Sequence, residues 1–295
     1  MAYLFSKLQK KYHLTLAIVH MNHRIRGRES DLDERSVRQL AERLNMSCFV
    51  ESVNVPALAK KSSESLETRA RFERYRFFAE TAQRERYECV ATAHHSDDQT
   101  ETILMRILRG TGLRGLSAMA ASQILYGIRV VRPLLGVSQK DIRSYLKKEK
   151  IFYREDRSNQ DPAYFRNRIR RELLPLLRKH YSPQIGTFLQ GLAQDAREYV
   201  DYLDRKAADF EKSFVRFKRN SVEVNRRAWL LEEAPLQKQL VLYALEKALG
   251  GKKVKRLHVA RLHQLALQGA SKPLALPLGW VFRVEGDIFS LRKTH

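Results

Sequence analysis

The fold of this 295-residue chain is decided by residues 89–107, which read CVATAHHSDDQTETILMRI. The first five residues are apolar or small, and a run of that length predicts a buried strand. Apolar side chains then recur at helical spacing over 100–107, and Ser96 stands where a helix cap is expected. A strand that leads directly into a helix is the repeating unit of an α/β domain.

The same alternation extends through the first half of the chain. Short apolar runs at 14–20, 48–53 and 128–131 predict further strands. Helical patterns are found at 1–11, at 37–44 and from Ser63 to Gln83. Apolar strands separated by helices predict a doubly wound parallel sheet that is covered on both faces. Such a domain ordinarily opens on a strand, whereas this sequence opens on a helix, so we expect the sheet to lack its first strand.

The second half of the chain has a different pattern, in which helices predominate. Ser138 and Asp141 form a capping-box-like start to a helix that ends near Lys150. Apolar residues at steps of three, four and seven predict a long amphipathic helix over 184–217, and shorter helices are predicted at 235–249 and 257–267. Residues 274–291 are typical of short strands joined by turns. We therefore predict a catalytic domain over 1–180 and a mainly helical domain over 181–295 that ends in short strands.

Composition narrows the class of protein. The two cysteines, Cys48 and Cys89, exclude a disulfide scaffold and every four-cysteine zinc or iron–sulfur site. They also fit a reducing compartment, so a cytoplasmic location is expected. Because no apolar run approaches eighteen residues, we predict no transmembrane helix and no membrane partner.

The net charge points to a polyanion. The chain holds 55 lysines and arginines against 33 acidic residues, which gives a formal charge of +22. The first 150 residues hold 27 basic and 17 acidic residues, and the remainder hold 28 and 16. Since both predicted domains are basic, nucleic acid is the natural partner, and an arginine-rich lineage is the alternative explanation.

Two acids follow the strand that ends at Ala93. Asp98 and Glu101 are three residues apart, so their side chains share one helix face, and His94 and His95 precede them. The carboxyl end of such a strand is where open α/β sheets bind ligands. The two acids could hold a divalent cation, hold an ammonium group or accept a proton. The alternative is that the aspartates only favour the helix N-terminus electrostatically.

Other polar positions have a plain structural explanation when taken alone. His20, Asn22 and His23 follow the first strand as a polar loop, and Arg71 could pair with Glu67 on a helix surface. The G-x-G-x-x-G at 110–115 follows a helix, so a helix-ending turn is expected there in place of a dinucleotide site. A basic run opposes the single acid Glu172, and its members are Arg166, Arg168, Arg170, Arg171, Arg178 and Lys179. That density suits phosphate contacts, although a solvated helix face would look the same.

Together these stretches resemble the tRNA(Ile)-lysidine synthetases, a family of N-type ATP pyrophosphatases. The resemblance rests on HMNHR at 20–24, SLETRARFERY at 65–75, TAHHSDDQTET at 92–102, RGTGLRGLS at 109–117, RPLL at 132–135, and EDRSN at 155–159 with RNR at 166–168. It runs nearly end to end, and the end of the chain is similar to the short form of the family.

The resemblance implies a reaction and its participants. The family ligates L-lysine to C2 of the wobble cytidine in an isoleucine tRNA with a CAU anticodon, using ATP with Mg²⁺ to adenylate the C2 oxygen. By resemblance, Asp98, Glu101 and His94 are expected at the reacting centre, and no metal ligand is assigned. The ATP site would include Arg71, His20, Asn22 and His23, and Arg71 and His94 would offset phosphate charge. The tRNA backbone would contact Arg166, Arg168, Arg170 and Arg171.

The oligomeric state is open, a homodimer included. An alternative role for the arginines is to pair with Glu155, Asp156 and Glu172 and so join the two domains.

One motif of the family does not occur in these 295 residues, namely the Ser-Gly-Gly-x-Asp-Ser loop that wraps ATP phosphates. We expect Met1 to fall just behind that loop, most simply because an internal methionine was taken as the start, with natural loss of activity as the second explanation. Two other functions compete with the ligase. One is a non-catalytic RNA-binding relic, and the other is a tRNA-thiolating relative, against which the lack of paired cysteines weighs.

Overall fold

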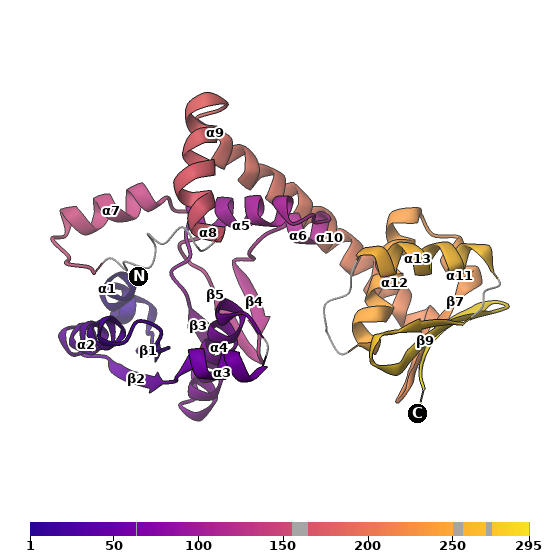
Figure 1. Ribbon diagram of the computed structural model, residues 1–295, viewed down its shortest axis with the longest axis horizontal. Helices are drawn as coiled ribbons and strands as arrows, with labels where there is room; N and C mark the ends of the chain where they lie inside the picture. The colour runs from indigo at the N-terminus through magenta and orange to yellow at the C-terminus, as the bar shows by residue number, and fades with distance from the viewer. Residues whose placement is uncertain (63, 155–164, 250–255, 270–272, 295) are drawn as a thin grey trace. The chain divides into compact units, whose positions relative to one another are not determined.

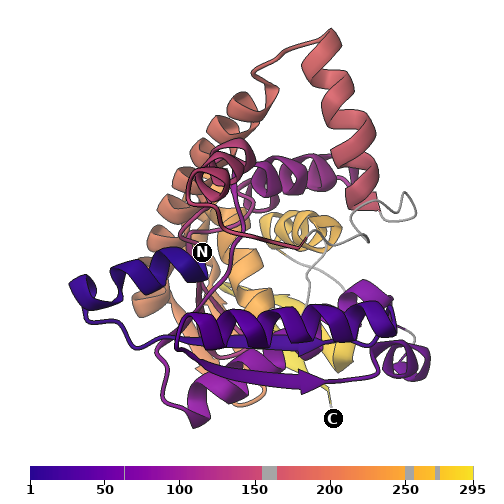
Figure 2. The same ribbon diagram turned by 90° about the vertical axis from the view of Figure 1, so that its left-hand side faces the viewer.

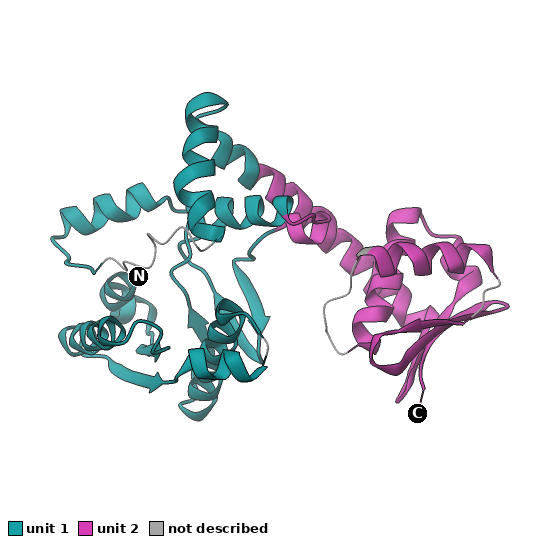
Figure 3. Ribbon diagram, in the orientation of Figure 1, with its two compact units in different colours: residues 1–108, 118–190 teal, residues 109–117, 191–295 magenta. Residues whose placement is uncertain are grey.

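The computed structural model describes residues 1–62, 64–154, 165–249, 256–269 and 273–294. The chain divides into two compact units (Figure 3), of which the first comprises 1–108 and 118–190 and the second 109–117 and 191–295. The division at 190/191 lies within helix α10 (Ile185–Phe214), ten residues after the domain boundary predicted from sequence.

The first unit is the predicted α/β domain, with its strands in two sheets (Figure 1). Strand β1 (Ala17–Asn22) pairs in parallel with β2 (Ser47–Ser52). Strand β3 (Cys89–Ala91) pairs in parallel with β5 (Ile128–Val131), which also pairs antiparallel with β4 (Ser122–Leu125). All four predicted strands are confirmed within a few residues at each end.

Strand β4 was not predicted. Its connection to β5 is the two-residue turn Tyr126-Gly127, in which both residues have positive φ, 50° and 83°. Two consecutive left-handed residues twist a hairpin in the direction that strands prefer. Since β4 lies at the sheet edge and is mostly exposed, it lacks the apolar run that would have marked it in the sequence.

Helix α4 (Leu66–Arg84) provides the apolar layer that both sheets share. Its Tyr75, Phe77, Phe78 and Ala82 form one buried cluster with Met21 of β1, Val90 of β3 and Val130 of β5. The Ser65 side chain caps the helix by accepting a hydrogen bond from the Thr68 N–H at 3.2 Å. The predicted cap Ser63 lies outside the described residues.

Of the remaining helices of this unit, α2 (Arg28–Arg43) packs against β1 and β2, and Figure 2 shows all of them in a second view. The bounds of the others are α1 (Ala2–Tyr12), α3 (Val55–Ser62), α5 (Ser96–Leu108), α7 (Gln139–Lys148), α8 (Phe165–Arg168) and α9 (Leu174–His180). The predicted cap of α7 is confirmed, because the Ser138 hydroxyl accepts from the Asp141 N–H at 3.1 Å. After α5, Gly110 takes a φ of +73°, in agreement with the predicted turn.

The second unit contains the predicted helices and a sheet larger than expected. Five antiparallel strands lie in the order β6-β7-β10-β9-β8. Their bounds are β6 (Val215–Lys218), β7 (Ser221–Asn225), β8 (Leu274–Leu276), β9 (Trp280–Glu285) and β10 (Ile288–Lys293). The helices of this unit are the second part of α10, with α6 (Leu113–Leu116), α11 (Arg226–Leu230), α12 (Ala234–Ala248) and α13 (Arg256–Gln268). Trp229, Phe282 and Phe289 are almost fully buried and centre the core between helices and sheet.

Candidate active site

The site is built where the chain leaves β3 and enters α5. The Thr92 N–H donates to the Val131 carbonyl at 2.9 Å, which extends the pairing of β3 with β5 by one residue. Asp98, in the first turn of α5, accepts a hydrogen bond from the His95 N–H at 3.0 Å. These bonds fix the loop, so its polar side chains lie at the carboxyl end of the strand, as the sequence predicted.

Asp98 and Glu101 lie together on α5 and are held by two arginines from a segment about seventy residues later. Arg166 donates through Nε to Glu101 at 2.7 Å and through a terminal nitrogen to Asp98 at 2.8 Å. Arg170 contacts both acids as well, with a terminal nitrogen 2.9 Å from Glu101 and 3.2 Å from Asp98. Two carboxylates and two guanidinium groups thus form one ion cluster, which we call the acid–arginine cluster.

The backbone around Arg170 is a turn of π-helix over Ile169–Leu173, in which the Leu174 N–H donates to the Ile169 carbonyl. Pro175 follows and has no N–H to offer the Arg171 carbonyl, which favours a local departure from α-helical bonding. Arg166 and Arg170 are four residues apart and both reach α5, whereas Arg168 and Arg171 are exposed. Isolated π-turns are frequent at functional sites.

Burial divides the roles of the two acids. The Glu101 side chain is 1% exposed, and both of its oxygens contact arginines. The Asp98 side chain is 13% exposed, and its Oδ2 contacts the His95 backbone and ring in place of an arginine. Of the four carboxylate oxygens in the cluster, Asp98 Oδ2 is therefore the one that contacts no arginine among the described residues, and it is better placed to bind a ligand.

His94 is a neutral group. Burial, together with the charges of the nearby Arg132, Arg166 and Arg74, lowers its pKa to about 4, although Asp98 opposes this change. Its Nδ1 lies 2.9 Å from the Thr92 hydroxyl. At pH 7 the ring can exchange hydrogen bonds with a ligand, but it contributes no positive charge against phosphates.

A second feature of this unit is a cavity of about 1020 Å³, which contains most of the residues predicted to bind ATP. His20, Asn22 and His23 line it, as does Arg74 of α4. The buried Nδ1 of His23 has no hydrogen-bond partner among the described residues, which leaves it available to a ligand. Burial, followed by the charge of Arg74, lowers the pKa of His23 to about 4, so this ring is also neutral.

The side chain of Asn22 has a structural role. Its amide nitrogen donates to Asp31 and Glu34, both at 3.1 Å, and its oxygen accepts from the Arg24 N–H at 3.0 Å. The side chain is thus committed to joining the end of β1 to α2.

Arg74 is the site residue that sequence reasoning missed. Arg71, which was predicted, is exposed and stacks over the Tyr75 ring, 4.8 Å from its centroid. Arg74 lines the cavity, and no carboxylate lies within ion-pair distance of it in the described part of the chain. Burial, and then the charges of Arg71 and Arg166, lower the pKa of its guanidinium, so an anion in the cavity would relieve an unfavourable charge.

The described residues contain no group of three histidine, cysteine, aspartate or glutamate side chains arranged to hold a metal ion. The two carboxylates best placed for one are neutralised by arginines. In the same residues, no helix is long and apolar enough to cross a membrane.

This architecture defines an α/β class with a polar site at the carboxyl end of a strand, and the sequence profile of the PP-loop domain family matches residues 1–177. The chain belongs to that family. It is similar to tRNA(Ile)-lysidine synthases, in keeping with the resemblance of its motifs. The protein from Caldanaerobacter subterraneus subsp. tengcongensis is 32% identical over 234 residues, which cover 79% of this chain and 49% of that protein.

Two further relatives of this chain are also named tRNA(Ile)-lysidine synthase. The protein from Geobacillus kaustophilus is 29% identical over 94% of this chain and 60% of its own length, and that from Geobacter sulfurreducens is 44% identical over 56% of this chain and 34% of its own length. The chain thus spans about half the length of the curated relatives it matches.

Among solved structures, the U34-tRNA thiolase NcsA from Methanococcus maripaludis with its [4Fe-4S] cluster aligns with a TM-score of 0.52 and 15% identity. The alignment covers 66% of this chain and 68% of the thiolase, and it confirms the fold class.

The acid–arginine cluster predicts unequal stability costs for its two acids. Glu101→Gln should lower the free energy of unfolding by about 3 kcal/mol, the lower end for breaking a buried ion pair, because both arginines keep some contact with water. Asp98→Asn should cost on the order of 1 kcal/mol, since asparagine keeps an oxygen for the arginines. Urea unfolding measures both. The exposed acid variant Glu42→Gln, expected to stay within about 0.5 kcal/mol, is the control. A Glu101 effect no larger than this control would contradict the cluster.

The neutral state of His94 can be observed by NMR titration of its imidazole, assigned through loss of the signal in His94→Gln. We expect a midpoint at about pH 4. In the unfolded chain histidine titrates near 6.5, so the unfolded state binds more protons between these values. The contribution of His94 to stability is therefore complete above about pH 6.5 and is lost as the pH falls toward 4. A midpoint at or above pH 6 would contradict the lowered pKa of His94.

Proposed function

We propose that this protein acts in the ATP-dependent ligation of L-lysine to C2 of the wobble cytidine in an isoleucine tRNA with a CAU anticodon. The observation that carries the proposal is the acid–arginine cluster at the carboxyl end of β3, in a chain similar to tRNA(Ile)-lysidine synthases. The site combines the buried carboxylate of Glu101, held by two guanidinium groups, with the partly exposed carboxylate of Asp98. This combination suits a reaction in which both an ammonium group and phosphates are bound.

The first half of the reaction would use the cavity of about 1020 Å³. The C2 oxygen of the cytidine attacks the α-phosphorus of ATP, an O–P bond forms, and pyrophosphate leaves. Negative charge accumulates on the phosphate oxygens, and fixed cations nearby favour that state. Arg74 lines the cavity without a carboxylate partner among the described residues, and His23 offers a neutral ring nitrogen. His20 and Asn22 also line this cavity, whereas Arg71 does not, and ATP contacts by these three residues stay predictions.

The second half requires lysine as a neutral amine. The ε-amine attacks C2, a C–N bond forms, and AMP departs with the former C2 oxygen, while the amine gives up protons. We assign the lysine ammonium and the first proton to Asp98, because its Oδ2 contacts no arginine in the part of the chain that the structure describes. Glu101 is then a positioning residue, since it is buried and its oxygens hold Arg166 and Arg170. His94 would bond to substrate as a neutral ring.

Magnesium is part of the predicted chemistry, but the described residues do not fit a protein-held ion. No group of three ligands exists among them, and Asp98 and Glu101 face arginines. A Mg²⁺ ion that arrives with ATP stays a prediction, and no step is derived from it. A cytoplasmic location and a homodimer likewise stay predictions.

The non-catalytic relic and the thiolating relative are the competing functions. The chain has two cysteines, Cys48 and Cys89, fewer than the four thiolates that usually bind an iron–sulfur cluster. The relic makes a different prediction from the ligase, because it would bind RNA without transferring lysine.

Lysine transfer tests the proposal directly. A chain that carries a Ser-Gly-Gly-x-Asp-Ser loop ahead of Met1 should attach labelled lysine to an isoleucine tRNA transcript when ATP is present. In that protein Asp98→Asn should lower the rate by roughly 10²-fold or more, the scale of a lost acid–base or electrostatic role. Glu42→Gln should leave it unchanged. If the loop-bearing protein binds tRNA but transfers no lysine, the relic is favoured over the ligase.

The four arginines predicted to bind tRNA should separate into two pairs. Arg168→Gln with Arg171→Gln should flatten the slope of log K against log salt for tRNA binding by about 1.4 to 1.8, the value for two phosphate contacts. Arg166→Gln with Arg170→Gln should lower the melting temperature and change the slope less, because these side chains neutralise Asp98 and Glu101. Equal slopes for the two double variants would contradict this division. Of the acids proposed as alternative partners, Glu155 and Asp156 lie outside the described residues.

A further inference from the structure

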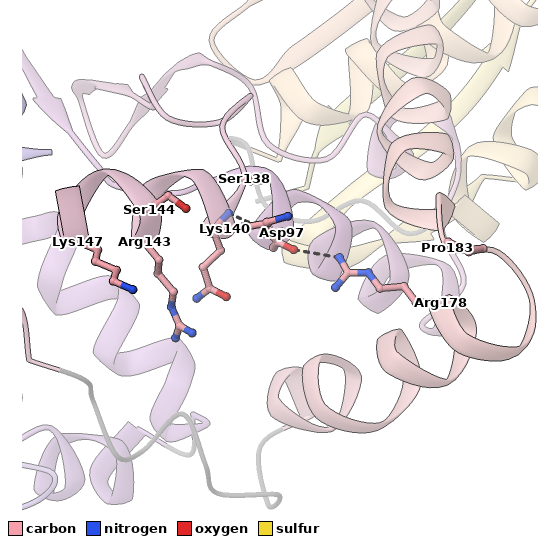
Figure 4. A pocket seen from close by; sticks show the side chains of 9 residues that line it. Asp97, Ser138, Lys140, Arg143, Ser144, Lys147, Arg178 and Pro183 are labelled. Carbon is pink, nitrogen blue, oxygen red and sulfur yellow. Dashed lines mark hydrogen bonds and ion pairs between the residues drawn. The ribbon is translucent and has the colours of Figure 1, made fainter.

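A second cavity in the first unit has a volume of about 640 Å³ and is strongly basic. Figure 4 shows its lining side chains around one open space. Its charged residues are Lys140, Arg143 and Lys147 of α7, Arg178 of α9, and Asp97 of α5. It shares no lining residue with the cavity assigned to ATP. We call it the α7 cavity.

The single acid of the α7 cavity is already neutralised. Asp97 accepts a hydrogen bond from the Gln139 N–H at 2.9 Å and pairs with Arg178 at 3.0 Å. Partial burial opposes its charge, but these two donors hold the pKa of its carboxyl below the usual range. The other cations of the cavity therefore gain little compensation from Asp97.

Two of these cations have no acid nearby. In the described part of the chain, neither Lys140 nor Lys147 has a carboxylate within ion-pair distance, and both side chains are exposed. The acids of α7 and its end are engaged elsewhere, since Asp141 bonds to Ser138 and Glu149 to Lys7. Two amides at the start of α7 are also used, because the Gln139 N–H donates to Asp97 and the Asp141 N–H donates to Ser138. The exposed lysine side chains are therefore the groups best placed to bind an anion.

The spacing of the cations matches an extended polyanion better than one phosphate. Lys140, Arg143 and Lys147 follow the i, i+3, i+7 pattern of one helix face. At 1.5 Å per residue the outer two stand about 10 Å apart along the helix. A strand of nucleic acid that rises about 3.4 Å per nucleotide presents roughly three phosphates over that length. The lining includes no aromatic side chain on which a base could stack.

We propose that the α7 cavity binds the phosphodiester backbone of RNA, independently of its base sequence. The proposal rests on the proposed function in that the RNA would be the tRNA substrate. Neighbouring aspartates then serve two sites, because Asp98 joins the acid–arginine cluster while Asp97 fixes Arg178 and the start of α7 in the α7 cavity. Because Asp97 and Asp98 are adjacent residues of α5, an RNA backbone bound in the α7 cavity would lie beside the acid–arginine cluster.

Salt-dependent binding of RNA to the 295-residue chain tests this proposal. Lys140→Gln with Lys147→Gln should flatten the slope of log K against log salt by about 1.4 to 1.8, since each phosphate contact contributes about 0.7 to 0.9. The change should be equal for an isoleucine tRNA and a non-cognate tRNA, because the backbone has no sequence. The control is Lys60→Gln with Lys61→Gln, two exposed lysines at the end of α3 that line neither cavity.

Conservative variants distinguish an effect of side-chain charge on RNA binding from an effect on folding. Lys140→Arg with Lys147→Arg should keep the original slope, and melting curves should match for all three double variants. A slope change no greater than that of the control, or absence of RNA binding by the wild-type chain, would overturn the proposal. If instead the loop-bearing protein transfers no lysine while the slope still depends on Lys140 and Lys147, the proposed ligase function fails and the RNA-binding cavity stands.

Discussion

Burial of the Glu101 carboxylate is the constraint on which the rest of the site depends. A charge withdrawn from water is tolerated only when paired and hydrogen-bonded, and Glu101 finds its partners 65 and 69 residues away. Arg166 and Arg170 must therefore come to α5, and with them the segment from α8 to α9. Because α5 also closes the loop after β3 through Asp98, one ion cluster connects the end of the sheet to the basic segment.

The chemistry follows from how that charge is shared. Two guanidinium groups neutralise two carboxylates, and within the described ranges Asp98 Oδ2 is the carboxylate oxygen of the cluster that contacts no arginine. His94 and His23 are half-buried and neutral, so positive charge beside the cavity assigned to ATP comes from arginines such as Arg74, which has no carboxylate partner in the described part of the chain. The cations that we propose for RNA are different ones, namely Arg168, Arg171 and those of the α7 cavity.

Much of this could be predicted from local sequence patterns, because apolar runs and helical spacing are local. The strands β1, β2, β3 and β5, and the shared helix face of Asp98 and Glu101, were found in that way. The pairing of Arg166 and Arg170 with those acids was not, since basic spacing looks the same whether it faces RNA or a carboxylate. Strand β4 is an exposed edge without an apolar run, and Arg74 differs from Arg71 only in burial, which the sequence does not display.

The central claim is that Glu101 and Arg170 stabilise one another, and a double-mutant cycle measures that coupling most directly. Glu101→Gln, Arg170→Gln and the double variant would be unfolded in urea under the same conditions. The double variant should lose less stability than the two single variants together, with a coupling energy of at least about 2 kcal/mol, within the range for residues in one ion-pair network. Additive losses, within about 0.5 kcal/mol, would show that the two side chains act independently and would contradict the account.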